Sequence, residues 1–430
     1  MSDTDLRALE RATESSPDDP RAWLARAQGE LRIGVRDDAV TAFYRAAALG
    51  GDLGAVREGL HALDMPATPW GHPFGDARRS RCSPLAGPRK GEIVARAPIL
   101  QKEADLVLGE DGTILTGLPG GLRRLEGRTF SRLSNVPIDG SWDTVTPAAG
   151  EGLVVATTGP STVVGPSGGD ISELYVAVGE RAYCIESRGP VRGGFDVPLI
   201  AAGSALILRE GAPSIASVHA MTPRLEEQRR FDAGSHGAAL TADSERIVFF
   251  DASGTHYVSL RALSWEGKPL LAFPFANAPR TEPVIDALGR ILVVTLESAP
   301  ASPSMNELSC VAEGKITWSH KFFGDHEGFV TIAATLDGGL WLATESHLER
   351  LDAQGRPVWA DDYWNRSDEL VADREGFVYS AAIDRDDPHL EARAPDGTEI
   401  FRVSGPFRPA AIDAFGRLLA VSKDEIVAIA

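Results

Sequence analysis

The chain has 430 residues, with 43 lysine and arginine residues against 61 aspartate and glutamate residues, and a formal net charge of -18. Hydrophobic residues make up 43% and charged residues 24%, a balance that excludes a disordered chain and a membrane protein and predicts a soluble globular one. The acidic balance also argues against nucleic acid as a partner, because phosphate recognition needs clustered positive charge.

No targeting signal is expected from the first twenty residues. They lack a basic segment followed by an apolar one, and no later window approaches about 18 uninterrupted apolar residues. The three cysteines, Cys82, Cys184 and Cys310, are widely spaced and odd in number, which favours reduced thiols over a disulfide framework or a zinc site. These features favour a cytoplasmic location without a membrane anchor.

Residues 1–64 form the first predicted unit, a helical arm. Apolar residues recur there at helical spacing from Asp5 to about Asp64. Prolines at positions 17 and 20 and glycines at positions 34, 50 and 51 divide the stretch into helices of roughly 8 to 15 residues.

The arm resembles a tetratricopeptide repeat. That repeat has a large aromatic residue, then a small residue, a turn glycine, and an Ala-Phe-Ala spacing on its second helix. The matching residues, in order, are Trp23, Ala27, Gly34, Ala39, Phe43 and Ala46. The resemblance implies about one and a half copies, whereas about three are needed to bury a continuous core. The arm should therefore dock either on the protein's own second domain or on a separate partner.

Residues 65–90 are rich in proline, glycine and arginine and show no periodicity, so we interpret them as a linker. The run Arg78-Arg79-Ser80-Arg81 is locally basic on an acidic protein. We expect it to lie against the chain's own acidic surface rather than against a foreign anion.

Residues 91–430 show the pattern of an all-β domain: short apolar runs bounded by Gly, Asp, Pro or Ser. One composite unit recurs, and the first turn of each copy is anchored at Gly112, Gly150, Gly203, Glu245, Gly289, Gly338, Gly376 and Gly416. The anchors recur about every 43 residues, the size of one four-stranded propeller blade. The predicted fold class is mainly β, an eight-bladed β-propeller with a short N-terminal α-helical (tetratricopeptide-like) arm. Residues 159–172 are interpreted as an insertion, with a degenerate extra blade as the alternative.

The ring is expected to close with a strand from the start of this domain. The chain ends at what reads as the third strand of the last unit. Residues 91–97 mimic the turn and strand of residues 396–402, so they should pair with the last blade and remove two free sheet edges.

The repeats resemble those of the pyrroloquinoline-quinone-like β-propellers, a superfamily of eight-bladed rings that includes quinoprotein dehydrogenases and non-catalytic assembly lipoproteins. The resemblance rests on the Pro-Val-Ile-Asp opening at residues 283–286 and the Gly-Lys-Ile-Thr-Trp ending at residues 314–318. It implies that Trp318 and Trp359 pack between blades. Quinoprotein catalysis would need a Ca²⁺ site, a catalytic aspartate and a planar slot for the quinone, and none can be placed in this sequence. We therefore expect no cofactor.

Candidate binding residues lie on the loops that should gather around the channel on one propeller face. They are Trp142, His236, Arg280, Asp325, His326, Trp364, Arg366 and His389. Trp364 and Arg366 are the favoured partner anchors, because such side chains dominate interface hot spots. No catalytic or metal-binding set is assigned, since no serine nucleophile elbow, phosphate loop or two-histidine zinc spacing occurs.

The predicted function is a non-catalytic scaffold or adaptor for a protein partner, with surfaces on the propeller loop face and on the arm. The alternative is a propeller enzyme or small-ligand sensor at the channel mouth, with His236, Asp325, His326 and His389 as its polar groups. A third hypothesis makes the arm and linker a lid over the propeller. Whether the protein is an enzyme stays open, with a non-enzyme favoured.

Overall fold

The computed structural model describes residues 3–71, 75–76, 78–99, 106–118, 120–138, 145–150, 153–158, 172–178, 181–188, 199–201, 204–211, 215–221, 227–234, 240–251, 258–277, 279–297, 305–323, 328–362, 366–383 and 386–430. Over these residues the fold is mainly β, with four helices followed by eight four-stranded antiparallel sheets. No helix within these ranges combines the length and apolar character needed to cross a bilayer.

The N-terminal arm consists of α1 (Asp3–Ser15), α2 (Pro20–Ile33), α3 (Arg36–Ala48) and α4 (Leu53–Ala62). Local signals set the ends of α2. The Asp19 side chain accepts a hydrogen bond from the Arg21 amide, and Pro20 opens the helix with its fixed φ. Gly34 ends it at a φ of 81°, a left-handed conformation that glycine adopts without steric cost.

Small residues bring the helices of the arm close together. The Phe43 side chain on α3 is fully buried, and its ring occupies the space that a Cβ on Gly59 of α4 would need. Ala27, Ala39 and Ala46 are fully buried in the same core. Because the ring of Phe43 fills this space, α3 and α4 pack at one fixed separation.

The strands form consecutive antiparallel hairpins, four to a sheet, except that the last sheet takes its outer strand from the start of the β domain. In chain order the sheets are β2–β5 (Leu106–Leu108, Ile114–Leu118, Gly121–Leu125, Arg132–Pro137), β6–β9 (Val145–Gly150, Leu153–Thr158, Ser172–Val178, Arg181–Arg188), β10–β13 (Leu199–Ala201, Ser204–Gly211, Ile215–Met221, Glu227–Gly234), β14–β17 (Leu240–Ala242, Arg246–Asp251, Val258–Ser264, Pro269–Phe275), β18–β21 (Val284–Ile285, Ile291–Glu297, Met305–Ala312, Lys315–Phe323), β22–β25 (Val330–Ala334, Leu340–Thr344, His347–Leu351, Pro357–Asp362), β26–β29 (Arg366–Ala372, Val378–Ala382, His389–Arg393, Glu399–Ser404), and β30–β32 with β1 (Arg408–Ile412, Leu418–Val421, Glu425–Ile429, Ile93–Pro98).

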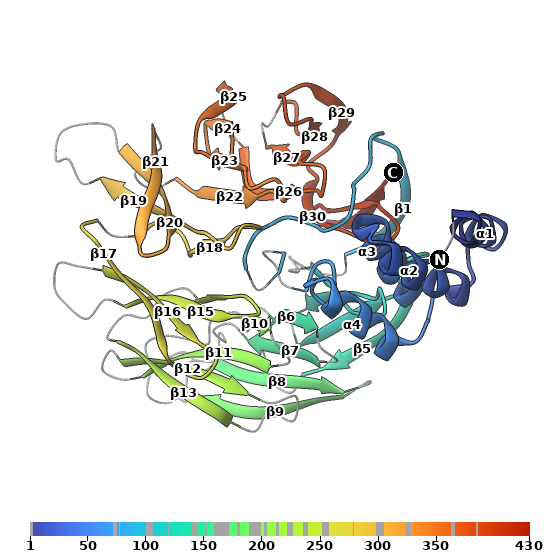
Figure 1. The fold of residues 1–430 in the computed structure, drawn as a ribbon, viewed down its shortest axis with the longest axis horizontal. Coiled ribbons are helices and arrows are strands. Elements are labelled where there is room, and N and C mark those ends of the chain that lie inside the picture. Colours follow the sequence, from blue (N-terminus) through green and yellow to red (C-terminus); the bar gives the residue numbers. More distant parts are fainter. Residues whose placement is uncertain are drawn as a thin grey trace.

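The sheets surround a common centre, with the first strand of each sheet innermost (Figure 1). Burial decreases from the inner to the outer strands of a sheet. The second strands β23 and β27 are buried along their whole length, whereas the fourth strand β25 has only exposed and partly buried residues. Apolar clusters lie between neighbouring sheets, as where Leu292 and Leu308 meet Leu340 and Leu342. The core is thus a series of layers between sheets.

The last sheet unites the two ends of the β domain. β1 lies antiparallel to β32, with Ile93 opposite Ile429 and Pro98 opposite Glu425. This pairing covers the edge of β32 that would otherwise expose unpaired backbone groups.

An aspartate–arginine pair joins neighbouring sheets at the turns between first and second strands. Asp286 Oδ1 accepts hydrogen bonds from the amides of Leu288 and Arg290 at 2.9 and 2.8 Å, and Arg290 Nε donates to Asp286 Oδ2 at 2.7 Å. The guanidinium of Arg290 then donates to the carbonyl oxygens of Gly338 and Ala353 in the next sheet, both at 2.6 Å.

An aspartate–arginine pair of the same kind joins the last sheet to the first. Arg417 Nε donates to Asp413 Oδ2 at 2.8 Å, and the guanidinium also donates to the carbonyl oxygens of Gly127 and Arg128 in the first sheet, the latter at 3.0 Å. Contacts of one kind therefore join the fifth sheet to the sixth and the last sheet to the first.

Trp318 on β21 and Trp359 on β25 each pack on a turn glycine of the next sheet. A Cβ on Gly355 would overlap the ring of Trp318, and a Cβ on Gly397 would overlap that of Trp359. Trp318 Nε1 also donates to the Ala353 carbonyl oxygen at 3.2 Å. Both indoles have the packing role expected from their place in the repeat.

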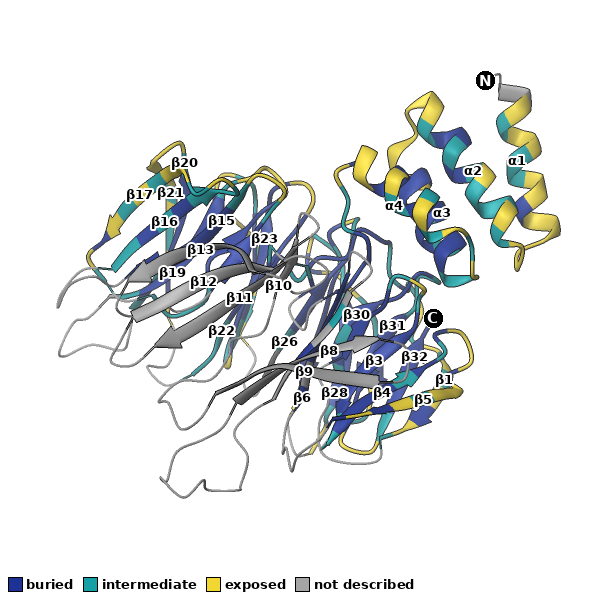
Figure 2. Ribbon diagram, turned by 90° about the horizontal axis from the view of Figure 1, so that it is seen from below, coloured by how far each residue is buried: buried dark blue, intermediate teal, exposed yellow. Residues whose placement is uncertain are grey.

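The arm packs on one side of the sheets, at the turns between first and second strands (Figure 2). Gly112 of the first sheet faces Ala48 so closely that a Cβ on it would lie 2.6 Å from the Ala48 Cβ. The Arg45 guanidinium lies 4.4 Å from the ring centre of Phe415 in the last sheet. α3 is thus fixed to two adjacent sheets.

A third sheet holds the arm through Arg374, whose Nη1 donates to the Asp37 carbonyl oxygen at 2.8 Å and to Thr41 Oγ1 at 3.0 Å. α1 lies on the side of α2 that faces away from the sheets (Figures 1 and 2). The arm therefore docks on the protein's own β domain, one of the two arrangements expected for an incomplete helical repeat.

Candidate functional site

The described residues between 66 and 89, which we call the channel segment, run across the centre of the sheets. In the first sheet the Leu108 amide donates to the Trp70 carbonyl oxygen at 2.8 Å, and in the second the Ala149 amide donates to the Gly71 carbonyl oxygen at 2.8 Å. The stretch interpreted from its composition as a linker therefore makes sheet-like contacts inside the β domain.

The channel segment also meets the inner strands of four further sheets. Arg79 Nε donates a hydrogen bond to the Leu240 carbonyl oxygen of β14 at 2.8 Å. The other three contacts are backbone hydrogen bonds of 2.8 to 3.0 Å that the strands donate to the segment: Ile285 of β18 to the Arg78 oxygen, Ala334 of β22 to the Ser80 oxygen, and Ala372 of β26 to the Arg81 oxygen. Inner strands present unpaired backbone groups toward the channel, and these hydrogen bonds satisfy them. The segment thus braces six sheets from within.

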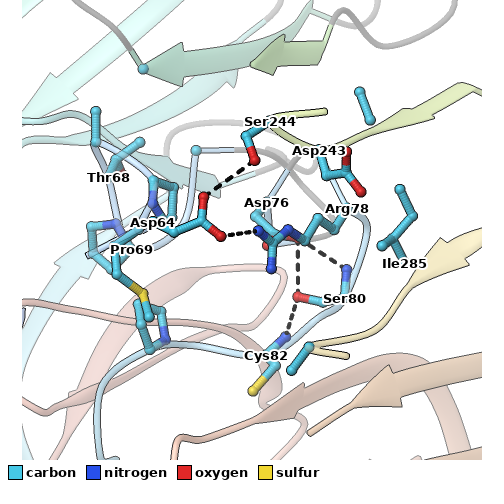
Figure 3. Close-up of a pocket in the computed structure, with 18 of the residues that line it drawn as sticks. Asp64, Thr68, Pro69, Asp76, Arg78, Ser80, Cys82, Asp243, Ser244 and Ile285 are labelled. Carbon is cyan, nitrogen blue, oxygen red and sulfur yellow. Dashed lines mark hydrogen bonds and ion pairs between the residues drawn. The ribbon is translucent and has the colours of Figure 1, made fainter. Parts of the chain in front are cut away.

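A cavity of about 290 Å³ remains between the channel segment, the end of α4 and the inner-strand ends of four sheets (Figure 3). Most of its lining is apolar, and a few polar side chains converge on it: His61, Asp64, Thr68, Asp76, Arg78, Ser80, Asp243 and Ser244. An apolar pocket with few polar groups is typical of small-ligand sites, and this volume lies near their lower limit of about 300 Å³.

Asp64 lies at the mouth of the cavity, at the end of the arm. One carboxylate oxygen accepts a hydrogen bond from Ser244 Oγ at 3.2 Å, and the other lies 3.4 Å from Arg78 Nη2. Asp64 has a φ of 52°, which is uncommon for a residue with a Cβ. Its side chain is 65% exposed, so the Arg78 contact is a solvated and weak ion pair.

Asp76 and Cys82 lie deeper. Asp76 Oδ1 accepts hydrogen bonds from the Ser80 amide at 3.1 Å and from the Ser80 hydroxyl at 3.0 Å. Burial raises the pKa of Asp76 above its usual range, although Arg78 acts in the opposite direction. Burial, reinforced by nearby carboxylates, also raises the pKa of the Cys82 thiol well above its usual range. A positive group placed here would stabilise the ionised form of Asp76.

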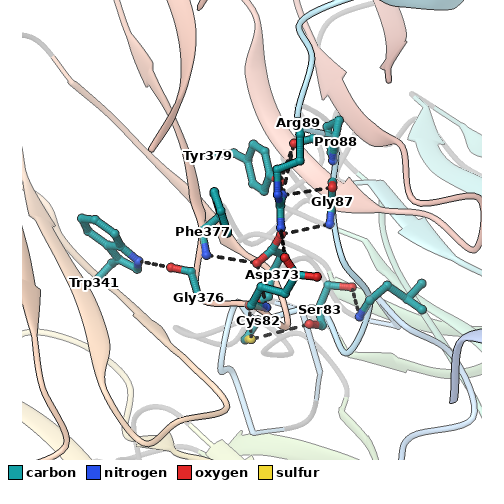
Figure 4. A network of polar contacts seen from close by, with 12 residues as sticks. Cys82, Ser83, Gly87, Pro88, Arg89, Trp341, Asp373, Gly376, Phe377 and Tyr379 are labelled. Atoms are coloured by element: carbon teal, nitrogen blue, oxygen red, sulfur yellow. Dashed lines mark hydrogen bonds and ion pairs between the residues drawn. The ribbon is translucent and has the colours of Figure 1, made fainter. Parts of the chain in front are cut away.

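A second polar network fixes the far end of the channel segment (Figure 4). Asp373, which is fully buried, lies 2.7 Å from Arg89 Nη2 and accepts a hydrogen bond from the Gly87 amide at 3.0 Å. Arg89 Nη1 donates to the Tyr379 hydroxyl at 2.8 Å, and the guanidinium lies 3.5 Å from the ring centre of Phe377. Burial, followed by the charge of Asp373, raises the pKa of Tyr379 far above its usual range.

This network takes the place that the aspartate–arginine pair has at the turns of Asp286 and Asp413. Where Asp286 and Asp413 are each followed four residues later by an arginine, Asp373 is followed by Phe377. Arg89 supplies the missing positive charge from the channel segment. The segment is therefore part of the β domain's own charge pairing.

Two of the predicted binding side chains are described, and both make internal contacts. Arg280 donates to Asn306 Oδ1 at 2.9 Å and to the Gly328 carbonyl oxygen, and burial lowers its pKa. His389 is 2% exposed, with Nδ1 2.7 Å from the Asp387 carbonyl oxygen. Neither lines the cavity: Arg280 precedes β18 and His389 opens β28, at strand ends opposite those that line it.

The remaining predicted residues are not brought together by the described part of the chain. Arg366 begins β26, but its side chain is not described, and the others lie outside the described residues: Trp142, His236, Asp325, His326 and Trp364. Their role in binding stays a prediction.

Sequence reasoning missed the cavity because its central residues lie in the stretch interpreted as a linker. The available signal was the basic run, whose expected environment is observed: Arg78 faces Asp64, and Arg79 lies 3.3 Å from Glu282. Among the residues that the structure describes, no group of three or more His, Cys, Asp or Glu side chains has an arrangement that could hold a metal ion.

No protein-family model matches the chain, and no curated protein matches its sequence. Among solved structures, the chain is similar to Saccharomyces cerevisiae Sqt1, with 9% identity over 79% of this chain and 99% of that one and a TM-score of 0.51. It is also similar to BamB from Moraxella catarrhalis (14% identity, 74% and 95% covered, TM-score 0.43) and to the β-propeller domain of the Trilobed protease from Pyrococcus furiosus (11% identity, 64% and 90% covered, TM-score 0.42). Identities this low describe the fold alone, a mainly β fold with propeller-like neighbours.

Proposed function

We propose that this protein is a cytoplasmic, non-catalytic protein-interaction scaffold, an eight-bladed β-propeller of the pyrroloquinoline-quinone-like type with a tetratricopeptide-like arm. The eight four-stranded sheets and the contacts of Arg417 with the first sheet support one closed ring. The buried Phe43 on α3, together with the small residues around it, supports the repeat-like nature of the arm.

The observation that most supports this proposal is that the channel segment and α3 hold the sheets and the arm together as one unit. The channel segment is hydrogen-bonded to six sheets, and α3 is fixed to the turns of three. A ring filled and braced at its centre presents its outer loops and helices in a preformed arrangement. Preformed surfaces lose little conformational entropy when a partner binds, which is what a scaffold requires.

Two surfaces are proposed for the partner. The first is the loop face that is predicted from the sequence to carry Trp364 and Arg366. The second is the exposed side of α1, which carries the exposed residues Arg7 and Arg11.

The test compares the whole protein with two double variants, Trp364→Ala with Arg366→Ala on the loop face and Arg7→Glu with Arg11→Glu on α1. A partner that co-purifies with the whole protein from its own source is identified, purified and titrated against each variant. We expect one double variant to weaken binding by about tenfold or more, as loss of an interface hot spot does.

The control is Glu245→Ala, a change at an exposed turn residue on the arm side of the sheets. Melting temperatures establish that each variant is folded. Unchanged affinity in both double variants would exclude these two surfaces and, with them, the proposed scaffold.

A further inference from the structure

We propose that the cavity beneath Asp64 binds a small primary amine, with the ammonium group at Asp76 and the apolar body against Ala149, Ile285 and Ala334. Such a site goes beyond the scaffold role and does not depend on it.

The charges around the cavity select a cation. Asp64 and Asp76 supply two carboxylates, Arg78 supplies one guanidinium, and His61 adds an exposed imidazole. Asp243, the third lining carboxylate, already pairs with Arg246 at 3.1 Å. Among the lining groups not already paired with Arg246, the carboxylates therefore outnumber the guanidinium by one. A neutral ligand would leave the extra carboxylate uncompensated, and an anion would be repelled.

Asp76 has the hydrogen-bonding capacity that an ammonium group needs. Both hydrogen bonds from Ser80 go to Oδ1, and no described residue donates a hydrogen bond to Oδ2. The side chain is only partly exposed although it lines the cavity. An ammonium donor at Oδ2 would make a charge-assisted hydrogen bond in a site that solvates the carboxylate poorly.

The size and mouth of the cavity limit the ligand to a small molecule. At about 30 Å³ for each water-sized unit of liquid, the cavity corresponds to about ten non-hydrogen atoms. Asp64 and Ser244 at the mouth are exposed, and the contact between Asp64 and Arg78 is long at 3.4 Å. A ligand can therefore enter by displacing the exposed contacts of Asp64 with Arg78 and Ser244.

The test uses three molecules of nearly equal shape: 2-phenylethylamine, the neutral 2-phenylethanol and the anion phenylacetate. Each is titrated calorimetrically into the full-length protein at neutral pH. We expect saturable binding of one 2-phenylethylamine per chain, with 2-phenylethanol and phenylacetate weaker by about tenfold or more.

Asp76→Asn keeps the shape of the side chain and removes its charge, so it should weaken binding of the amine by about tenfold or more. The matched control is Asp111→Asn, in a turn on the same side of the sheets but outside the cavity, which should bind the amine as the unaltered chain does. If Asp76→Asn does not fold, the affinity of the unaltered chain is followed from neutral pH down to about pH 4, where it should fall as Asp76 gains a proton.

Three results would overturn the proposal. The first is binding of 2-phenylethanol or phenylacetate with the same affinity as 2-phenylethylamine. The second is no saturable binding of any of the three molecules, which would mean that only water fills the cavity. The third is an affinity for the amine that changes neither with Asp76→Asn nor, where that variant fails to fold, with pH.

Discussion

His320 Nε2 lies 2.9 Å from Glu349 Oε2 across the boundary between two sheets. His320 belongs to β21, the outer strand of one sheet, and Glu349 to β24 of the next. His347 approaches the same carboxylate oxygen at 3.5 Å with Nε2, and its Nδ1 lies 2.6 Å from Asp362 Oδ1. The two sheets are thus joined by a cluster of imidazoles and carboxylates.

This cluster should make the protein most stable between about pH 4.5 and 6.5. Burial opposes ionisation of Glu349, but hydrogen bonds with His320 and His347 outweigh it and lower the pKa of Glu349 to about 2. Its contribution is present above about pH 4.5 and is lost as the pH falls toward 2. The hydrogen bond with Glu349 raises the pKa of His347 against the effect of burial, so this contribution is present below about pH 6.5 and is lost as the pH rises past the raised value.

The measurement is the free energy of unfolding in urea across this pH range. His347→Gln should remove about 0.5–1.5 kcal/mol at pH 6 and flatten the decline above pH 6.5. His61→Gln, which alters an exposed histidine of the arm, is the control. A decline that is equally steep in His347→Gln and in the unaltered chain would show that the cluster is not its source.

Arg89→Met should destabilise the protein by about 3 kcal/mol, because it leaves the fully buried Asp373 without its positive partner. Arg96→Met is the matched control: Arg96 pairs with Glu425 at 2.5 Å, but its side chain is 54% exposed, so its loss should cost at most about 1 kcal/mol. Urea unfolding of both variants tests this difference. Similar costs for the two changes would contradict the assigned role of Arg89.

Gly59→Ala should destabilise the arm by about 1–3 kcal/mol, because the new Cβ would overlap the ring of Phe43. Helix propensity alone would favour alanine, so a loss identifies packing as the cause. Glu58→Ala, at an exposed position of the same helix, should change stability by less than about 0.5 kcal/mol. Thermal unfolding of the two variants distinguishes these effects, and a gain in stability for Gly59→Ala would refute the packing argument.

Cys82 should react slowly with iodoacetamide in the folded protein at pH 8. The residue is 6% exposed, and the raised pKa keeps the thiol protonated, whereas the thiolate is the reactive form. Peptide-level mass spectrometry measures its modification before and after unfolding in urea. Equal rates in both states would contradict the buried position of this thiol.

Elements with a local sequence requirement were predictable. Gly112, Gly289 and Gly416 mark turns between first and second strands, each with a φ of 72° that favours glycine over any residue with a Cβ. Trp318 recurs at a fixed place in the repeat and packs as expected. These signals are readable because each turn or indole follows from a few neighbouring residues.

The path of the channel segment was not predictable, because its contacts are mostly backbone hydrogen bonds to strands far away in the sequence. The Ala334 amide that meets the Ser80 oxygen requires no particular side chain at either position. The cavity is also non-local: Asp64, Asp76 and Ser244 come together only when the arm, the segment and the sheets are assembled. The sequence-based sites were chosen from loops on the opposite strand ends, so they could not include it.

The pairing of β1 with β32 sets a condition on folding. β1 leaves the ribosome long before β32, so its partner does not exist until almost the whole β domain has been synthesised. Contacts between such distant residues form slowly, and an unpaired strand can associate with other chains in the meantime. A chain that stops before β32 would lack the partner of β1 and the strand between β1 and β31. We therefore expect loss of the last few residues, which belong to no proposed binding surface, to cause misassembly of the whole β domain and not merely the loss of one strand.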